Sequence, residues 1–182
     1  SRYSRSIIKM RKEFLELGQI VGTHGVRGEM RLNPRCDSAE FAKKFKTVYF
    51  DERGNVPVKV ISCRPHGNAA LIKLEGTDTV EQAQALRNRV IYIKRSDVNL
   101  PDGQWFIAEL IGCTVFDADN TSTVYGKLSD VMQTGANDVW AVTDDRGREY
   151  LLPAIKNVII KTDVENDAVF IRPLRGIFDD AD

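Results

Sequence analysis

GQIVGTHGVRGEMRL, residues 18–32, is the stretch that decides how the first half of the chain is interpreted. It spaces Gly22, Gly25 and Gly28 three residues apart, between two segments in which apolar and polar residues alternate. A dinucleotide-binding loop would open a helix, and a P-loop would continue into Gly-Lys-Ser/Thr, whereas a strand pattern follows here. The triplet therefore predicts a tight turn between two strands, with glycines that allow positive φ or close backbone approach.

The remainder of residues 14–95 predicts a small closed β-barrel. Short alternating runs bounded by turn residues are expected to be strands, two of them joined as a hairpin by PHGN. The segment TVEQAQALRN, residues 79–88, predicts the clearest helix, because Thr79 can cap it and a glutamine follows at capping-box spacing. Residues 38–45, SAEFAKKF, predict one or two further helical turns. Six short strands with a helix near the end are typical of a barrel.

A second domain is expected after a linker. Residues 96–104, SDVNLPDGQ, are rich in Pro, Gly, Asn, Asp and Ser, as connections between domains are. Residues 105–182 return to short strands separated by turn signals such as DDRG and ENDA. The predicted fold class is mainly β, with two small β-barrels in tandem and one or two short helices. Residues 1–13 are expected to be a tail, and Met10 the natural start, so that residues 1–9 would be foreign to the native protein.

The formal net charge of zero conceals an uneven distribution. Residues 1–100 hold 19 Lys and Arg against 11 Asp and Glu, a balance of +8, while residues 101–182 hold 7 against 15, a balance of −8. A basic half suits a polyanion and an acidic half suits a basic protein. The alternative is that the two halves simply attract each other. No run of about 18 apolar residues is present, so no transmembrane helix is expected.

No catalytic or metal-binding constellation is found in the sequence. Two histidines cannot build a histidine-rich metal site, and Cys36, Cys63 and Cys113 are widely spaced without a CxxC pair. The cysteines are expected to be small buried apolar residues of a protein from a reducing cytoplasm. The paired carboxylates at residues 144–145 and 179–180 are expected to be solvated turn or terminal residues rather than a general acid and base. No enzyme activity, cofactor or metal is predicted.

Some residues remain as candidate contacts because the turns and strands do not require them. His24 and Arg27 could present their side chains to phosphate or a partner, although a loop arginine is often only solvated. Trp105 and Phe106 are adjacent at the domain junction, so on a strand one would be buried and the other exposed. Burial of both against the linker is the alternative. The sequence GAND, residues 135–138, is expected to be a turn tip before a strand.

Five segments taken together resemble the RimM family of ribosome maturation factors. They are, in the family's order, GQIVGTHGVRGEMRL, LEGTDTVEQAQALRNRVIYIKRSDV, WFIAELIGCTVFD, LSDVMQTGANDVWAV and YLLPAIKNVIIKTDVENDAVFIRPLRGIFD. With the segments between them they run from Phe14 to Asp179. The resemblance implies an N-terminal RimM barrel followed by a C-terminal PRC-type barrel.

The resemblance also implies a function that depends on binding. Members of the family are non-enzymatic assembly factors that bind the immature small ribosomal subunit, assist maturation of its head and rRNA processing, and associate with ribosomal protein nineteen of that subunit. At a paired aromatic position important for subunit binding they commonly carry two tyrosines. Trp105 and Phe106 stand here instead, and Glu109 replaces a common aspartate. The phenolic hydroxyls are lost, together with any hydrogen bond that they make.

The charge distribution and the resemblance lead to one hypothesis about partners. The basic half is expected to face the rRNA of the head, and the acidic half to receive the basic ribosomal protein. The candidate contacts to rRNA are His24, Arg27 and Arg31. The candidate contacts to the ribosomal protein or the subunit are Trp105, Phe106, Glu109, Asn137 and Asp138. The alternatives are an enzyme that processes or modifies rRNA and a general protein adaptor. We expect a cytoplasmic monomer.

Overall fold

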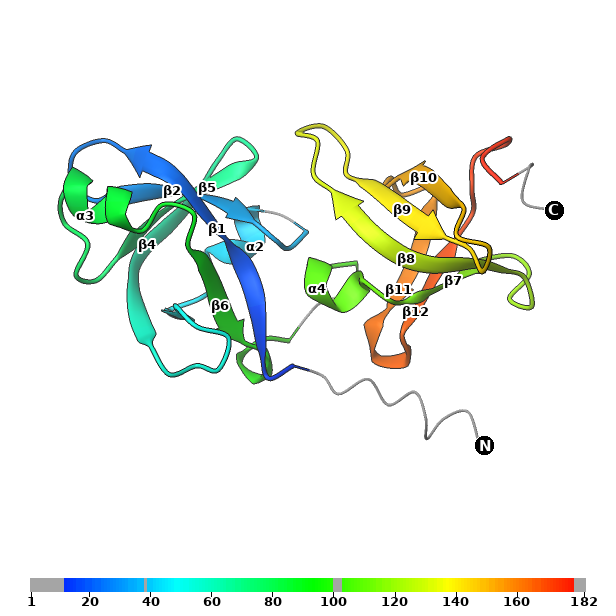
Figure 1. Cartoon of the computed structure of the whole chain (residues 1–182), viewed down its shortest axis with the longest axis horizontal. Coiled ribbons are helices and arrows are strands. Elements are labelled where there is room, and N and C mark those ends of the chain that lie inside the picture. The colour runs from blue at the N-terminus through cyan, green and yellow to red at the C-terminus, as the bar shows by residue number, and fades with distance from the viewer. Residues whose placement is uncertain (1–11, 38, 100–102, 179–182) are drawn as a thin grey trace. The chain divides into compact units, whose positions relative to one another are not determined.

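The computed structural model describes residues 12–37, 39–99 and 103–178, which belong to two compact units (Figure 1). Unit 1 is formed by Ser1–Pro34 and Ser38–Asn99, and unit 2 by Arg35–Asp37 and Leu100–Asp182. A three-residue segment from the first half of the sequence is therefore part of unit 2. Residues 1–9, part of the predicted linker and the carboxylates at 179–180 lie outside the described residues.

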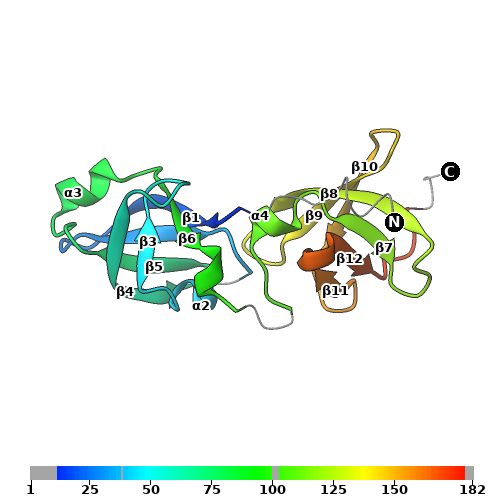
Figure 2. The ribbon, with the colours of Figure 1, turned by 90° about the horizontal axis from the view of Figure 1, so that it is seen from below.

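Unit 1 is a closed six-stranded antiparallel barrel, as the sequence predicts. Its strands are β1 (Phe14–His24), β2 (Glu29–Pro34), β3 (Thr47–Tyr49), β4 (Pro57–His66), β5 (Ala69–Leu74) and β6 (Val90–Lys94). They are hydrogen-bonded in the order β1-β2-β5-β4-β3-β6, and β6 pairs again with β1. Figure 2 shows these strands curving around one another. Closure removes the free edges at which a sheet would otherwise pair with other chains.

Alternation of side chains along the strands builds the barrel core. On β2, Met30 and Leu32 are fully buried, whereas Arg31 between them is exposed. Leu17 and Ile20 of β1 are also fully buried although they are three residues apart. The strand changes register with its neighbours along this stretch, and such a β-bulge shifts which residues point inward.

Two short helices of unit 1, α3 (Val80–Ala85) and α2 (Ala39–Ala42), form where the sequence predicts helical turns. Helix α3 begins after Thr79, whose side-chain oxygen accepts a hydrogen bond from the backbone N–H of Gln82. The Gln82 side chain accepts in return from the Thr79 N–H at 3.2 Å, which completes the predicted capping box. Helix α2 is a single turn, and η1 (Arg95–Asp97) follows β6.

Unit 2 contains a six-stranded sheet with one parallel pair. Its strands are β7 (Thr114–Asp117), β8 (Val124–Met132), β9 (Val139–Thr143), β10 (Glu149–Pro153), β11 (Ile159–Asp163) and β12 (Ala168–Ile171). They lie in the order β10-β9-β8-β7-β12-β11, so β10 and β11 are the ends of the ladder, and β12 runs parallel to β7. Helix α4 (Ile107–Leu110) precedes the sheet and η2 (Val164–Asn166) joins β11 to β12.

The core of unit 2 is organised around Trp140, whose side chain is fully buried. Ile107 and Leu110 of α4 pack into the same apolar cluster, which fixes the short helix against the sheet. Within the described residues, no helix is long and apolar enough to cross a membrane.

Candidate nucleic-acid interface

The turn between β1 and β2 needs two of its three glycines for distinct reasons. Gly25 and Gly28 have φ of 67° and 87°, in the left-handed region that residues with a side chain rarely adopt. A Cβ atom on Gly28 would lie 2.1 Å from the carbonyl oxygen of Thr77, so close backbone approach also requires glycine there. Gly22 differs, because it lies within β1 at a shift in register and has open space around its Cβ position.

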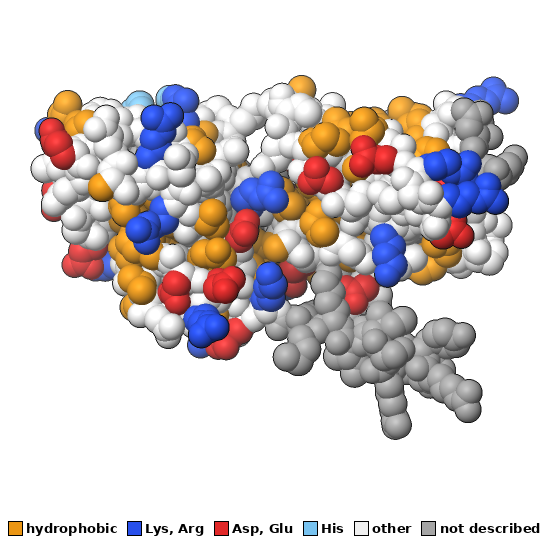
Figure 3. All heavy atoms as spheres, in the orientation of Figure 1, with side chains coloured by type: hydrophobic (Ala, Val, Ile, Leu, Met, Phe, Trp, Pro, Cys, Tyr) orange, Lys and Arg blue, Asp and Glu red, His pale blue; other side chains and the backbone are white. Residues whose placement is uncertain are grey.

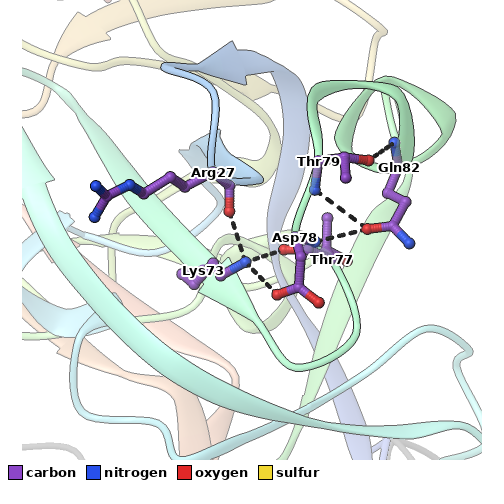
Figure 4. A network of polar contacts seen from close by, with 6 residues as sticks. All are labelled: Arg27, Lys73, Thr77, Asp78, Thr79 and Gln82. Atoms are coloured by element: carbon purple, nitrogen blue, oxygen red, sulfur yellow. Dashed lines mark hydrogen bonds and ion pairs between the residues drawn. The ribbon is translucent and has the colours of Figure 1, made fainter.

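Lys73 of β5 ties this turn to the beginning of α3 (Figure 4). Its Nζ donates hydrogen bonds to the carbonyl oxygens of Arg27, at 2.7 Å, and Thr77, and to Oδ1 of Asp78, at 2.8 Å. The backbone N–H of Asp78 in turn donates to Oε1 of Gln82 at 2.7 Å. The backbone at Arg27 is thereby held in place, while Figure 4 shows its side chain extending away from the network.

The outward face of β2, β5 and β4 carries basic side chains in register. Arg31 of β2 and Arg64 of β4 are both exposed and are both paired with Leu71 of β5, so they lie on the same face on either side of this fully buried residue. Figure 3 shows the histidine side chains, in pale blue, beside blue Arg or Lys side chains on unit 1. His24 ends β1 and His66 ends β4, with their ring centroids 5.4 Å apart.

The carboxylate of Glu29 stands within this basic face, beside Arg64. Arg64 donates to it from Nη2, at 2.9 Å from Oε1, and from Nε, at 3.4 Å from Oε2. His24 Nε2 lies 3.9 Å from Oε1. The hydrogen bond from Arg64 lowers the pKa of Glu29 below its usual value, against the opposing effect of desolvation. The carboxylate is therefore ionised at neutral pH.

The turn borders a surface hollow of about 450 Å³, which we call the turn hollow. Its lining residues are His24, Gly25, Val26, Arg27, Glu29, Ser62 and Lys73. Val26 is 77% exposed at the tip of the turn. Within the described part of the chain, the guanidinium groups of Arg27 and Arg31 make no hydrogen bond or ion pair, so both are available to an anion.

Sequence reasoning named His24, Arg27 and Arg31 but missed the residues around them. Lys73, Glu29, Arg64 and His66 join the same surface through the pairing of four strands that are not all neighbours in the sequence. The alternation in the β4 and β5 hairpin places Lys73 and Arg64 on the outward face, which was the available signal. The pairing of β2 with β5 brings these residues next to the turn. The alternation within the β4–β5 hairpin does not predict that pairing.

The aromatic pair in unit 2 faces the interior more than solvent. Phe106 is fully buried and its backbone pairs with Cys36 in an isolated bridge, so its side chain offers no surface to a partner and we do not propose it as a contact. Trp105 is half-buried, and its ring packs edge-on against the ring of Trp140, with the two ring centroids 5.4 Å apart. The Asp37 backbone N–H donates to the Trp105 carbonyl oxygen at 3.0 Å, which explains why residues 35–37 belong to unit 2.

Trp105 borders a second hollow, of about 740 Å³, within unit 2. Isoleucines of the β10–β11 region line it together with Lys156 and Lys161. The remaining candidates, Asn137 and Asp138, lie in the β8–β9 turn, with Asn137 exposed. Burial raises the pKa of Asp138 above its usual value.

Glu109, the other candidate of unit 2, is half-buried on α4. Neither Glu109 nor the β8–β9 turn is among the residues that line the hollow beside Trp105. The structure therefore does not gather the four candidates Trp105, Glu109, Asn137 and Asp138 around that hollow.

Two observations on the described residues concern metal and thiol chemistry. No group of three or more His, Cys, Asp or Glu side chains there is arranged to hold a metal ion. Cys36 and Cys113 are buried, while Cys63 is half-buried and burial raises the pKa of its thiol to about 11. A thiol with so high a pKa is a poor nucleophile at neutral pH.

Comparison with known proteins agrees with the fold. The family model of the RimM N-terminal domain matches residues 15–98, and that of the RimM PRC barrel domain matches residues 107–177. The ribosome maturation factor RimM of Clostridium botulinum (strain Langeland) is 42% identical over 165 residues, which cover 90% of this chain and 96% of that protein. The RimM protein of Clostridium tetani is 36% identical with the same coverage.

A solved structure of a RimM protein from Pseudomonas aeruginosa is 25% identical and covers 87% of this chain and 96% of its own, with a TM-score of 0.44. The matched domains and relatives place the chain among the ribosome maturation factors. It belongs to the RimM family.

Proposed function

We propose that this protein is a non-enzymatic assembly factor that binds the immature small ribosomal subunit and assists maturation of its head and rRNA processing. In this proposal unit 1 contacts rRNA through the outward face of β2, β5 and β4. The observation that carries it is the pair of exposed guanidinium groups, Arg27 and Arg31, which make no ion pair within the described residues. Arginines of this kind bind phosphate oxygens in two-pronged geometry.

The charges of the two units support this division of roles. The described residues of unit 1 hold 14 Lys and Arg against 10 Asp and Glu, a balance of +4, and those of unit 2 hold 8 against 12, a balance of −4. The sequence halves differ by more because four basic residues of the first half and four aspartates of the second half lie outside the described residues; they are Arg2, Arg5, Lys9, Arg11, Asp102, Asp179, Asp180 and Asp182. A net positive barrel attracts a polyanion over distances of about 8–10 Å at physiological salt.

For unit 2 the proposed partner is a basic protein of the subunit head, ribosomal protein nineteen. The exposed Asn137 and the half-buried Trp105, Glu109 and Asp138 are the proposed contacts. The protein would act by preferential affinity for one state of the head or for the free ribosomal protein, and so shift the population towards the mature form. No bond-making step is needed, and the proposed site of action is the cytoplasm, as a monomer.

Co-sedimentation of the full chain with precursor small subunits tests this function. We expect binding that weakens as salt rises, with no change in the length or mass of the rRNA. A change in rRNA mass would instead favour a processing or modifying enzyme. Arg27→Gln with Arg31→Gln should lower the salt dependence on single-stranded RNA by about 1.4 in logarithmic slope, since each phosphate contact contributes about 0.7.

Exposed arginines elsewhere on unit 1 provide the matched control. Arg53→Gln with Arg87→Gln removes the same charge outside the proposed face. Equal loss of binding in the two double variants would mean that binding depends on the net charge of the protein and not on the position of the arginines, and would overturn the proposed face.

A further inference from the structure

The turn hollow contains a group that phosphate binding does not explain. Glu29 is an ionised carboxylate in the middle of a face proposed to meet a polyanion, and it lines the hollow beside Arg27. A carboxylate repels phosphate oxygens. It accepts hydrogen bonds only, so its natural partners in RNA are the N–H groups on the edge of an unpaired base.

The Glu29 carboxylate retains capacity for such donors. Its two oxygens offer about four acceptor positions. Arg64 occupies one position well, at 2.9 Å, and a second weakly, at 3.4 Å. The side chain is 21% exposed, so the remaining positions are open to solvent rather than sealed in the barrel. Arg64 also holds the carboxylate in place, which reduces the entropy lost when a base binds.

The other walls of the hollow suit the faces of a base and its backbone. The exposed Val26 side chain supplies an apolar surface, and the His24 ring an aromatic surface on which a base can stack. Arg27 lies on the same rim with its guanidinium unpaired within the described residues. Its volume of about 450 Å³ falls within the range of small-ligand sites.

We propose that the turn hollow binds one unpaired guanine of an RNA strand. The base replaces the weak 3.4 Å contact between Arg64 Nε and Glu29 Oε2, so that Glu29 accepts from its N1–H and N2 amino groups, and Arg27 contacts an adjacent phosphate. Guanine alone among the four bases presents two adjacent donors on its Watson–Crick edge, and these match the two oxygens of a carboxylate. This assignment rests on the proposed binding of rRNA by unit 1 and specifies what that face recognises.

Single-stranded RNAs of about 12 nucleotides, within the usual site size of such proteins, test the assignment with the full chain. The probes are oligouridine and the same strand with a few uridines replaced by guanosine, adenosine or inosine. Fluorescence anisotropy should give about tenfold tighter binding for the guanosine strand than for oligouridine, the discrimination typical of a two-pronged base contact. Inosine lacks the N2 amino group and should lie in between, and adenosine should resemble uridine.

Glu29→Gln separates base recognition from fold and charge. This variant should lose the preference for guanosine, while its affinity for oligouridine stays the same or rises because a negative charge is removed. Loss of affinity for every strand would indicate a structural role and overturn the assignment. Glu75→Gln, an exposed carboxylate just beyond β5, is the control and should retain the preference.

The outcomes distinguish this inference from the function beneath it. Salt-dependent binding of all strands with equal affinity would overturn the guanine site and leave the rRNA-binding function standing. No binding to any strand or to precursor subunits would overturn both. Guanosine monophosphate alone should bind more weakly than the guanosine strand. Tighter binding of the free nucleotide would show a mononucleotide site and overturn the assignment to RNA.

Discussion

The β1–β2 turn of unit 1 and the aromatic pair of unit 2 are the two segments that resemble binding motifs in the sequence, and they face opposite environments. Val26 and Arg27 at the turn are exposed, and the backbone beneath them is held by Lys73. Phe106 is fully buried, and Trp105 packs on the core residue Trp140. A polar tip on a rigid base can present side chains to a partner, whereas an aromatic pair beside a small core is largely used to complete that core.

Phe106→Ala should give the largest effect on stability, because this residue is the fully buried member of the aromatic pair. Removing a fully buried aromatic ring should lower the free energy of unfolding of unit 2 by about 3–5 kcal/mol. Both tryptophans of the chain, Trp105 and Trp140, lie in unit 2, so denaturation followed by tryptophan fluorescence reports on that unit. Ile160→Ala, at an exposed position of β11, should change the midpoint little. A folded Phe106→Ala protein of unchanged stability would return Phe106 to the list of contacts.

Lys73→Met should loosen the turn and lower the free energy of unfolding of unit 1 by about 1.5–3 kcal/mol, because the ammonium group donates three hydrogen bonds and the buried Thr77 would lose a partner. Hydrogen exchange should accelerate at Thr77 and Asp78, whose backbone N–H groups are hydrogen-bonded beside the Lys73 ammonium group, but not in β9. Lys73→Arg is the conservative control and should restore part of the protection. Unchanged exchange at Thr77 and Asp78 in Lys73→Met would mean that this segment does not depend on the Lys73 network.

Gly28→Ala should destabilise unit 1 by about 1–3 kcal/mol, because φ of 87° is strained for alanine and its Cβ would meet the Thr77 carbonyl oxygen. Gly22→Ala is the matched comparison within the same glycine triplet. It should cost less, since nothing lies within 4 Å of the Cβ position. Thermal unfolding followed by far-ultraviolet circular dichroism measures both. Equal losses would show that the glycine spacing, and not the contact with Thr77, determines stability.

The smallest effect concerns two carboxyl groups with opposite pKa shifts. The folded-state pKa of Glu29 is lowered by Arg64, so its contribution to stability is present above the unfolded pKa and is lost as the pH falls through the folded value. Burial raises the folded-state pKa of Asp138, because the charged carboxylate is desolvated. The folded state therefore binds this proton more tightly than the unfolded state does, and lowering the pH through the raised pKa stabilises the folded state. Carboxyl chemical shifts recorded against pH should show the two midpoints on opposite sides of the usual range.

Arg64→Met should raise the midpoint of Glu29 and leave that of Asp138 in place. The stability change should be below about 1 kcal/mol, because Arg64 is largely exposed and solvent screens the pair. A Glu29 midpoint that does not move would mean that the Arg64 contact is not maintained in solution.

Local features of the fold were predictable because their causes are local. The capping box at Thr79 and Gln82 needs only residues within one turn of helix, and the hairpin of β4 and β5 needs a short turn between alternating runs. The same holds for the left-handed glycines of the β1–β2 turn. The closed barrel also followed from the number and length of the strands. The candidate arginines could be named because they stand on or next to that turn.

What required the tertiary structure depends on pairing between distant strands. Nothing in the pattern around Glu29 and Arg64, which are 35 residues apart, indicates that they form an ion pair in the turn hollow. Likewise, residues 35–37 pair with the segment at Trp105 and Phe106 and so join unit 2.

Alternation, caps and turn residues act over a few neighbours, so the family, the two-unit β architecture and the position of the β1–β2 turn could be inferred from the amino-acid sequence. Which side chains surround that turn, and which aromatic residues remain accessible, became clear from the three-dimensional structure alone. Burial and cross-strand contact follow from packing of the whole unit, and a local pattern does not contain that information.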